Sequence, residues 1–310
     1  MTDLLEVFKT RASVRKFKHE PLREGDLEKI LFAARRAPTD ATAQMYSLLR
    51  VTDTSLRQKI AQLAGGQEHI EAAAEFFLIL ADVHRLRRLV EHKGAVWGHW
   101  PRTAAHFAIT DAVLAGSALA TMAEWLGYGI CWIGGVLNNI REIGDLCKLP
   151  KGVFPVAGLC VGVPEERPKP RPRLARELVV HENHYREPSS DELAAALVDM
   201  APITRSGNWH ALLARYFAEG GTMEQREGPY QAFAARQGFD PDIEPDAAGD
   251  AAAGSLGSLI QKTLEGGFRG VQFGPGHVWI EKETAAYRGE GPPGKALQSA
   301  LLSWKAENKA

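Results

Sequence analysis

The spacing of hydrophobic residues predicts one amphipathic helix and four short strands in the first half of the chain. Between residues 24 and 37, apolar side chains recur at i, i+3, i+4 and i+7 from Leu27, which forms one stripe of a helix. Pro38 is expected to end this helix. Apolar runs predict strands at 46–52, 76–81, 130–133 and 153–163. The run 76–81 has no turn residue, so we expect that strand to be buried on both faces.

The longest apolar segment, residues 104–126, predicts a helix inside the core. Its apolar positions lie nearly all round a helix, and His106, Asp111 and Glu124 interrupt it, which disfavours a membrane span. Small residues near its middle are expected to let another element approach closely; they are Ala112, Ala115, Gly116 and Ala118.

After about residue 188 the pattern changes and predicts shorter elements. They are a helix at 189–200, helical sequence at 216–238 broken by Gly220-Gly221, a hairpin of 271–273 with 277–280, and a helix at 295–305. Residues 240–257 are acidic and then alanine-rich, which is typical of a linker. We therefore divide the chain into a core (1–188), a helical segment associated with the core (189–239), a linker (240–258) and a C-terminal extension (259–310).

Composition and charge narrow the class of protein. The 310 residues are 45% hydrophobic and 24% charged, as in a soluble globular protein. The formal net charge of −1 gives no general attraction to nucleic acid or to an anionic membrane. Three cysteines without C-x-x-C spacing favour a reducing cytoplasm over a disulfide framework or a zinc site. The first eight residues lack the long apolar run of a signal peptide.

Two basic segments are candidates for binding a phosphate. In the first, Arg11, Ser13 and Arg15 alternate with apolar residues, so an extended backbone places all three on one side. Two guanidiniums and a hydroxyl suit a phosphate by charge and geometry. In the second, prolines stiffen the chain around Arg171 and Arg173. Considered alone, each segment is explained better as a solvated basic loop.

Other motifs are weaker. Gly134-Gly135 follows a predicted strand, so backbone N–H groups there can meet a ligand closely, although a plain turn is equally compatible. His181 and His184 have the spacing of a metal-binding pair but lie in loop-like sequence, so no metal site is expected. The sequence has no phosphate loop and no G-x-G-x-x-G after a strand, which argues against Rossmann-type nucleotide binding. No G-x-S-x-G supports a hydrolase triad.

Taken in order, the motifs resemble the nitroreductase superfamily, and within it the branch of oxygen-insensitive NADPH nitroreductases and flavin reductase P. The resemblance covers about residues 5–188 and rests on residues 11–15, 33–38 with Gln44, 65–67, 132–135 with 138–139, 149–150, 153–164, 171–174, and 180–183 with Tyr185. It implies an α+β fold with a central mixed sheet flanked by helices, a homodimer, and FMN held between the subunits.

The resemblance also implies which residues bind FMN. The matching positions are Arg11, Ser13, Arg171 and Arg173 for the phosphate, with Ala12 among them, Arg15 for the pyrimidine edge, Thr39 and Gln44 for the ribityl chain and ring, Gln67 for the ring edge, and Ile133, Gly134 and Gly135 for the backbone beside flavin N5. Because the chemistry takes place at N5 and Arg15 acts as an electrostatic tuner, the protein needs no catalytic acid or base.

The implied function is transfer of hydride from NADPH or NADH through FMN to small conjugated acceptors (nitroaromatics, quinones or flavins) by a ping-pong mechanism. Three departures leave the nicotinamide and the acceptor open: 38–44 replaces a serine-rich run, Val136-Leu137 stands where the branch has an arginine, and 219–226 lacks a clear arginine-rich loop. Two other functions stay open. One is a flavin-binding protein without nicotinamide turnover, flavin-fragmenting or sensor-like, and the other is a phosphate-binding interaction module.

Overall fold

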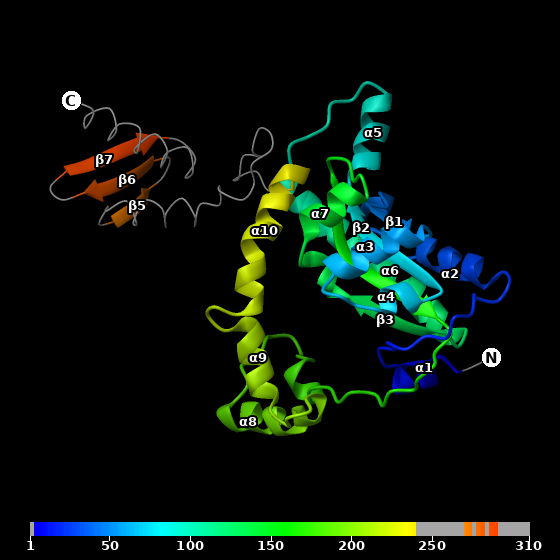
Figure 1. Ribbon diagram of the computed structural model, residues 1–310. Coiled ribbons are helices and arrows are strands. Elements are labelled where there is room, and N and C mark those ends of the chain that lie inside the picture. The colour runs from blue at the N-terminus through cyan, green and yellow to red at the C-terminus, as the bar shows by residue number, and fades with distance from the viewer. Residues whose placement is uncertain (1–2, 240–269, 275–276, 283–284, 291–310) are drawn as a thin grey trace. The chain divides into compact units, whose positions relative to one another are not determined.

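The computed structural model describes residues 3–239 and the backbone of three further strands, 270–274, 277–282 and 285–290. It forms two compact units, Met1–His99 with Thr103–Tyr230, and Trp100–Arg102 with Gln231–Ala310. The elements (Figure 1; η marks a 3-10 helix) are α1 (Leu4–Thr10), α2 (Asp26–Arg35), η1 (Asp40–Thr42), β1 (Tyr46–Arg50), α3 (Thr54–Leu63), α4 (His69–Ala72), β2 (Glu75–Asp82), α5 (His84–His92), α6 (Pro101–Trp125), β3 (Gly129–Ile133), η2 (Gly134–Leu137), α7 (Ile140–Leu146), β4 (Val153–Gly162), η3 (Arg176–Leu178), α8 (Ser190–Asp199), η4 (Ala201–Ile203), α9 (Trp209–Phe217), α10 (Thr222–Gln237), β5 (Gly270–Gly274), β6 (His277–Lys282) and β7 (Ala285–Glu290).

The first unit is built on a four-stranded sheet with the order β1-β2-β4-β3. All four predicted strands are confirmed, and every residue of the central strand β2 is buried, as its unbroken apolar run predicts. The three strand ladders are antiparallel. The described parallel pairing is an isolated bridge between Ser13 and Ile130, so the α+β class is confirmed with a sheet that is more uniformly antiparallel than the term "mixed" suggests.

Successive side chains of β2 point to opposite faces of the sheet and divide the core in two. Phe76, Leu78 and Leu80 pack with buried residues of α3, α4, η2 and α7 on one face. Phe77 and Ile79 pack with buried residues of α2 and α6 on the other. The period of two along a strand therefore produces a layered core of helices, sheet and helices.

Helix α6 packs closely against the sheet at Gly116. A Cβ atom on Gly116 would lie 2.6 Å from Cη2 of Trp132 and 3.3 Å from Cγ2 of Ile79. This confirms the prediction that small residues on this helix let another element approach. The expectation of burial all round is wrong for the described chain, because Val113 is 45% and Leu114 is 38% exposed. The helix instead buries one stripe of alanines and glycine with Asp111.

By length and composition, α6 is the one helix of the described residues that could cross a membrane. The same test is passed by core helices of soluble proteins, and the buried stripe of α6 faces the sheet. The helix is therefore explained as a core element.

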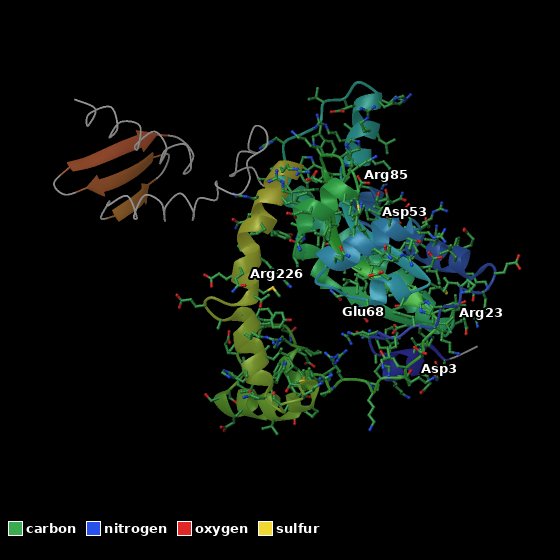
Figure 2. The ribbon with its side chains drawn as sticks, in the orientation of Figure 1. Asp3, Arg23, Asp53, Glu68, Arg85 and Arg226 are labelled. Carbon is green, nitrogen blue, oxygen red and sulfur yellow. The ribbon has the colours of Figure 1, made fainter. Side chains whose placement is uncertain are left out.

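A buried carboxylate joins the start of α2 to the end of α6. Asp26 accepts hydrogen bonds from Arg23 Nε, Lys29 Nζ and Tyr128 Oη, each at 2.8 Å. These bonds hold the pKa of Asp26 well below its usual range, with Lys29 and Arg23 as the largest causes. Arg23, labelled in Figure 2, also donates to the carbonyl of Leu126 at 2.6 Å. The network fixes the loop before α2 to the turn that leads into β3.

The predicted elements of the C-terminal half are confirmed where the structure describes them. Helix α8 matches the predicted helix, and the break at Gly220-Gly221 separates α9 from α10. Strands β5 and β6 form the predicted hairpin, and β7 adds a third antiparallel strand. The predicted linker (240–258) and the predicted helix at 295–305 lie outside the described residues, and the predicted domain boundaries stay predictions.

The contact at Gly116 generates a stability prediction. Gly116→Ala is expected to lower the free energy of unfolding by about 1–3 kcal/mol, because Trp132 or the helix must shift to admit the methyl group. Gly228→Ala in α10 is the matched control, since no atom lies within 4 Å of the added Cβ. Urea unfolding of both variants measures the effect. Equal stabilities of Gly116→Ala and the wild type contradict the proposed close packing.

Candidate functional site

The first basic segment lies along β3. Ser13 bridges to Ile130, and the N–H of Val14 donates to the carbonyl of Ile130 at 2.9 Å. Val14 is buried and Arg15 is exposed, whereas Arg11, Ala12 and Ser13 are all half-buried, so the predicted alternation is seen only at the end of the segment. The backbone of this segment therefore runs beside β3, the strand at one edge of the sheet.

Two glutamates, Glu166 and Glu124, contact this segment, and neither belongs to a predicted binding motif. Glu166 Oε1 accepts from the backbone N–H of Arg15 at 2.6 Å and of Lys16 at 3.1 Å. Glu124, on α6, lies with Oε1 3.4 Å from Nε of Arg11. Burial raises the pKa of Glu124, and the charge of Arg11 opposes that rise. Neither pairing has a local signal, since each joins residues more than a hundred positions apart.

Three of the predicted ligand arginines act on the same point of β3. Burial raises the pKa of the Cys131 thiol, and the charges of Arg15, Arg11 and Arg171 oppose that rise. Backbone contacts with Ile130 place segment 11–15 at β3, whereas no described contact joins Arg171 to that segment.

Arg173 is placed differently. Its Nη1 donates to the carbonyls of Arg171 and Pro172, at 3.1 Å and 3.0 Å. Its guanidinium thus lies along its own loop, and no described contact brings it to Arg11.

The glycine pair at the end of β3 has two distinct environments. A Cβ on Gly135 would lie 2.3 Å from both the carbonyl oxygen of Ala64 and Nε2 of Gln67. Gln67 Nε2 in turn donates to the Ala64 carbonyl at 2.7 Å. A Cβ on Gly134 would meet no atom within 4 Å, and this residue is exposed. Gly135 is therefore required by close packing, whereas Gly134, next to the buried Ile133, faces open space.

The loop of residues 39–45 carries backbone strain. Ala41, Thr42 and Gln44 have positive φ values of 45°, 56° and 53°. The left-handed conformation costs a non-glycine residue roughly 1–2 kcal/mol. Thr39 is half-buried and Gln44 is exposed. The described contacts do not join either side chain to the residues around β3.

Two charged side chains hold the strained loop. The buried carboxylate of Asp111 accepts from the N–H of Asp40 through Oδ1 and of Met45 through Oδ2, each at 2.9 Å. Arg85 Nη2 donates to the carbonyls of Gln44 and Tyr46. Arg85 is labelled in Figure 2, at the start of α5. From the sequence alone, Asp111 is only an interruption of an apolar helix.

His69 was also missed by the sequence analysis. It follows Gln67 and Glu68 (labelled in Figure 2), and its Nε2 is buried without a hydrogen-bond partner among the described residues. Burial lowers the pKa of His69, and the charge of Arg15 lowers it further, against the effect of Glu166. Burial and the charge of Arg15 thus both disfavour the charged form of the imidazole.

Two other features lie apart from these residues. An open hollow of about 470 Å³ between α2 and α6 has a lining that shares no residue with the group around β3. Among the described residues, no three His, Cys, Asp or Glu side chains are grouped to hold a metal ion. His181 Nδ1 instead accepts from the N–H of Arg186 at 3.4 Å.

Comparison with known proteins identifies the family. The family model described as "Nitroreductase family" matches residues 8–163, half of the chain. The chain belongs to the nitroreductase family. This confirms the resemblance seen in the motifs, and the match contains segment 11–15, the strained loop and the glycine pair.

Individual relatives extend the match. The chain is 38% identical over 195 residues to the oxygen-insensitive NADPH nitroreductase of Salmonella typhimurium, covering 63% of this chain and 79% of the relative. It is 31% identical over 243 residues to the Cr(VI) reductase of Pseudomonas sp., covering 76% and 98%. The structure of the NADPH:FMN oxidoreductase of Vibrio harveyi complexed with NAD+ superposes with a TM-score of 0.65 at 27% identity, covering 74% of this chain and 97% of that one. About a quarter of this nitroreductase-family chain thus lies outside the last two matches.

Proposed function

We propose that this protein is an FMN-dependent oxidoreductase that passes hydride from NADPH or NADH to small conjugated acceptors such as nitroaromatics, quinones or flavins. The observation that carries the proposal is the backbone contact that holds the basic segment of Arg11 and Arg15 along β3, the strand that ends at the open Gly134. Relatives named as nitroreductases and FMN reductases support the same reaction class.

The residues present suit FMN by charge and shape. Its phosphate is close to a dianion, which guanidiniums bind with two parallel hydrogen bonds. We propose that Arg11, Ser13 and Arg171 hold this phosphate near the backbone of Ala12, and that Arg173 joins them by leaving its own loop carbonyls. The open space at Gly134 lets a flat ring approach the backbone without meeting a side chain.

The remaining predicted contacts orient the ring. We propose that Arg15 faces the pyrimidine edge, that Gln67 borders the ring beside Gly135, and that Thr39 and Gln44 contact the ribityl chain and ring from the strained loop. Gln67 supports this placement because its amide already lies against Gly135. The backbone of Ile133–Gly135 would then flank the reacting edge of the ring.

Bound FMN would supply a hydride acceptor and donor at N5, so the protein itself needs no acid–base pair. The task of Arg15 is to stabilise negative charge at the pyrimidine edge. Because one open face must serve both nicotinamide and acceptor, we propose that they bind in turn, as in a ping-pong mechanism. A site that selects by shape and stacking accepts several flat, electron-poor acceptors.

We also propose a cytoplasmic homodimer that binds neither nucleic acid nor membranes. The nearly neutral chain offers no general attraction to either polyanion. Exposed apolar side chains support an interface between subunits, because association would remove them from water. They include Leu4, Leu5 and Phe8 of α1, Val113 and Leu114 of α6, and Val179 and Val180.

The function predicts a yellow protein that oxidises a nicotinamide. Purified protein is expected to show a flavin spectrum and to oxidise NADPH or NADH when a quinone is added. Gly134→Ala is expected to weaken FMN binding about tenfold while the fold stays intact, because a methyl group enters the open space. Protein that neither contains nor binds FMN contradicts the proposal and favours an interaction module. Bound flavin without nicotinamide oxidation favours the alternative of flavin binding alone.

The placement of Arg15 predicts its effect on the flavin potential. Arg15→Gln is expected to lower the midpoint potential by about 30 mV, which corresponds to about 1.4 kcal/mol for two electrons. Reduction by nicotinamide slows accordingly. Arg171→Gln is the matched control, since losing a phosphate contact weakens FMN binding and leaves the potential unchanged. Spectroelectrochemical titration of the FMN-bound variants measures both, and equal potentials in Arg15→Gln and the wild type refute the placement.

The homodimer predicts a molecular mass twice that of the 310-residue chain. Light scattering at micromolar concentration is expected to give this mass for the FMN-bound protein. Phe8→Glu, which places a charge among the exposed apolar residues of α1, is expected to shift the protein towards the monomer and to release FMN. A monomer that retains FMN contradicts an intersubunit site.

A further inference from the structure

The buried acid Asp111 has a role that rests on the proposed function. Asp111 is fully buried in the middle of α6, on the stripe that faces the sheet. A buried carboxylate needs partners, because leaving it unpaired is costly. Its described partners are the backbone N–H groups of Asp40 and Met45. Both oxygens of Asp111 therefore serve one loop and no side chain.

The two bonds enclose the strained part of that loop. Asp40 and Met45 stand on either side of Ala41, Thr42 and Gln44, the three residues with positive φ. Left-handed residues other than glycine persist where surrounding contacts determine the backbone. Asp111 holds the N–H groups at both ends, while Arg85 holds the carbonyl of Gln44. Residues 40–45 are thus clamped in a conformation that their own preferences disfavour.

We propose that Asp111 is a positioning residue for the flavin. It sets the backbone of the 39–45 loop before FMN arrives, so that Thr39 and Gln44 are presented without a cost of ordering at the moment of binding. It is not a catalytic residue, since its oxygens are buried and occupied by the loop.

The test uses Asp111→Asn in the full chain. Asparagine keeps one acceptor oxygen and places an amide donor against the second N–H, so one bond of the clamp is lost. FMN affinity, measured by fluorescence titration of apoprotein, is expected to fall about tenfold or more, which is the scale of one charge-assisted hydrogen bond. Deuterium exchange of a peptide spanning residues 39–46 is expected to accelerate in the apoprotein.

Asp26→Asn is the matched control for general destabilisation. It also neutralises a buried aspartate, but its bonds go to Arg23, Lys29 and Tyr128. It is expected to lower the melting temperature while keeping wild-type FMN affinity and wild-type exchange at residues 39–46. An equal loss of FMN affinity in both variants at matched stability overturns the positioning role, as does wild-type affinity in Asp111→Asn.

The wild type provides a measurement that does not depend on the variant folding. If Asp111 clamps the loop, the amides of Asp40 and Met45 are protected from exchange in the apoprotein. Exchange at the rate of an unprotected chain overturns the role even if Asp111→Asn fails to fold. If the wild type does not bind FMN, the proposed function and the positioning role of Asp111 both fail. If the wild type binds FMN and Asp111→Asn binds it with the same affinity, only the positioning role fails.

Discussion

The close approach of α6 to the sheet is the contact on which the rest of the site depends. Gly116 brings the helix within van der Waals reach of Trp132 and Ile79, and this is possible only without a side chain. The same helix holds Asp111 about one turn earlier and Glu124 two turns later. This one packing contact therefore sets how far the carboxylates of Asp111 and Glu124 lie from the sheet. A helix held further from the sheet would place neither acid at its loop.

Acidic and basic side chains have different roles in this site. The carboxylates of Asp111 and Glu166 accept hydrogen bonds from backbone N–H groups, so their oxygens are engaged by the loops they hold. The guanidiniums of Arg15 and Arg171 have no carboxylate partner among the described ion pairs. Arg11 is the exception, since it pairs with Glu124. An incoming phosphate has to share Arg11 with that acid, which gives Arg171 the larger part of the proposed anchoring. A nearly neutral chain can thus present a local surplus of positive charge.

The sequence predicts the elements well because their signals are local. The segment with the apolar stripe from Leu27 forms α2, and the apolar runs form the four strands. Both could be predicted because the period of side-chain burial is visible in the local sequence. The burial of α6 was overestimated because composition does not show which face a helix presents to solvent or to another subunit. For the site, Gln67 and Gly135 were predicted separately, and only the fold brings them into contact. Glu124, Glu166 and His69 had no motif, because their roles depend on partners distant in the chain.

The two glycines after β3 show how structure and function select the same residue for different reasons. Gly135 is required in the protein alone, since any side chain would meet the carbonyl of Ala64 and the amide of Gln67. Gly134 has no such requirement, and alanine would be free of strain there in the absence of a ligand. Neither packing nor backbone conformation therefore requires glycine at position 134. We explain the glycine there by a ligand that approaches the backbone from outside. In this chain that position lies at the end of β3, the strand that the basic segment 11–15 follows, which is where a flat, anionic cofactor is proposed to bind.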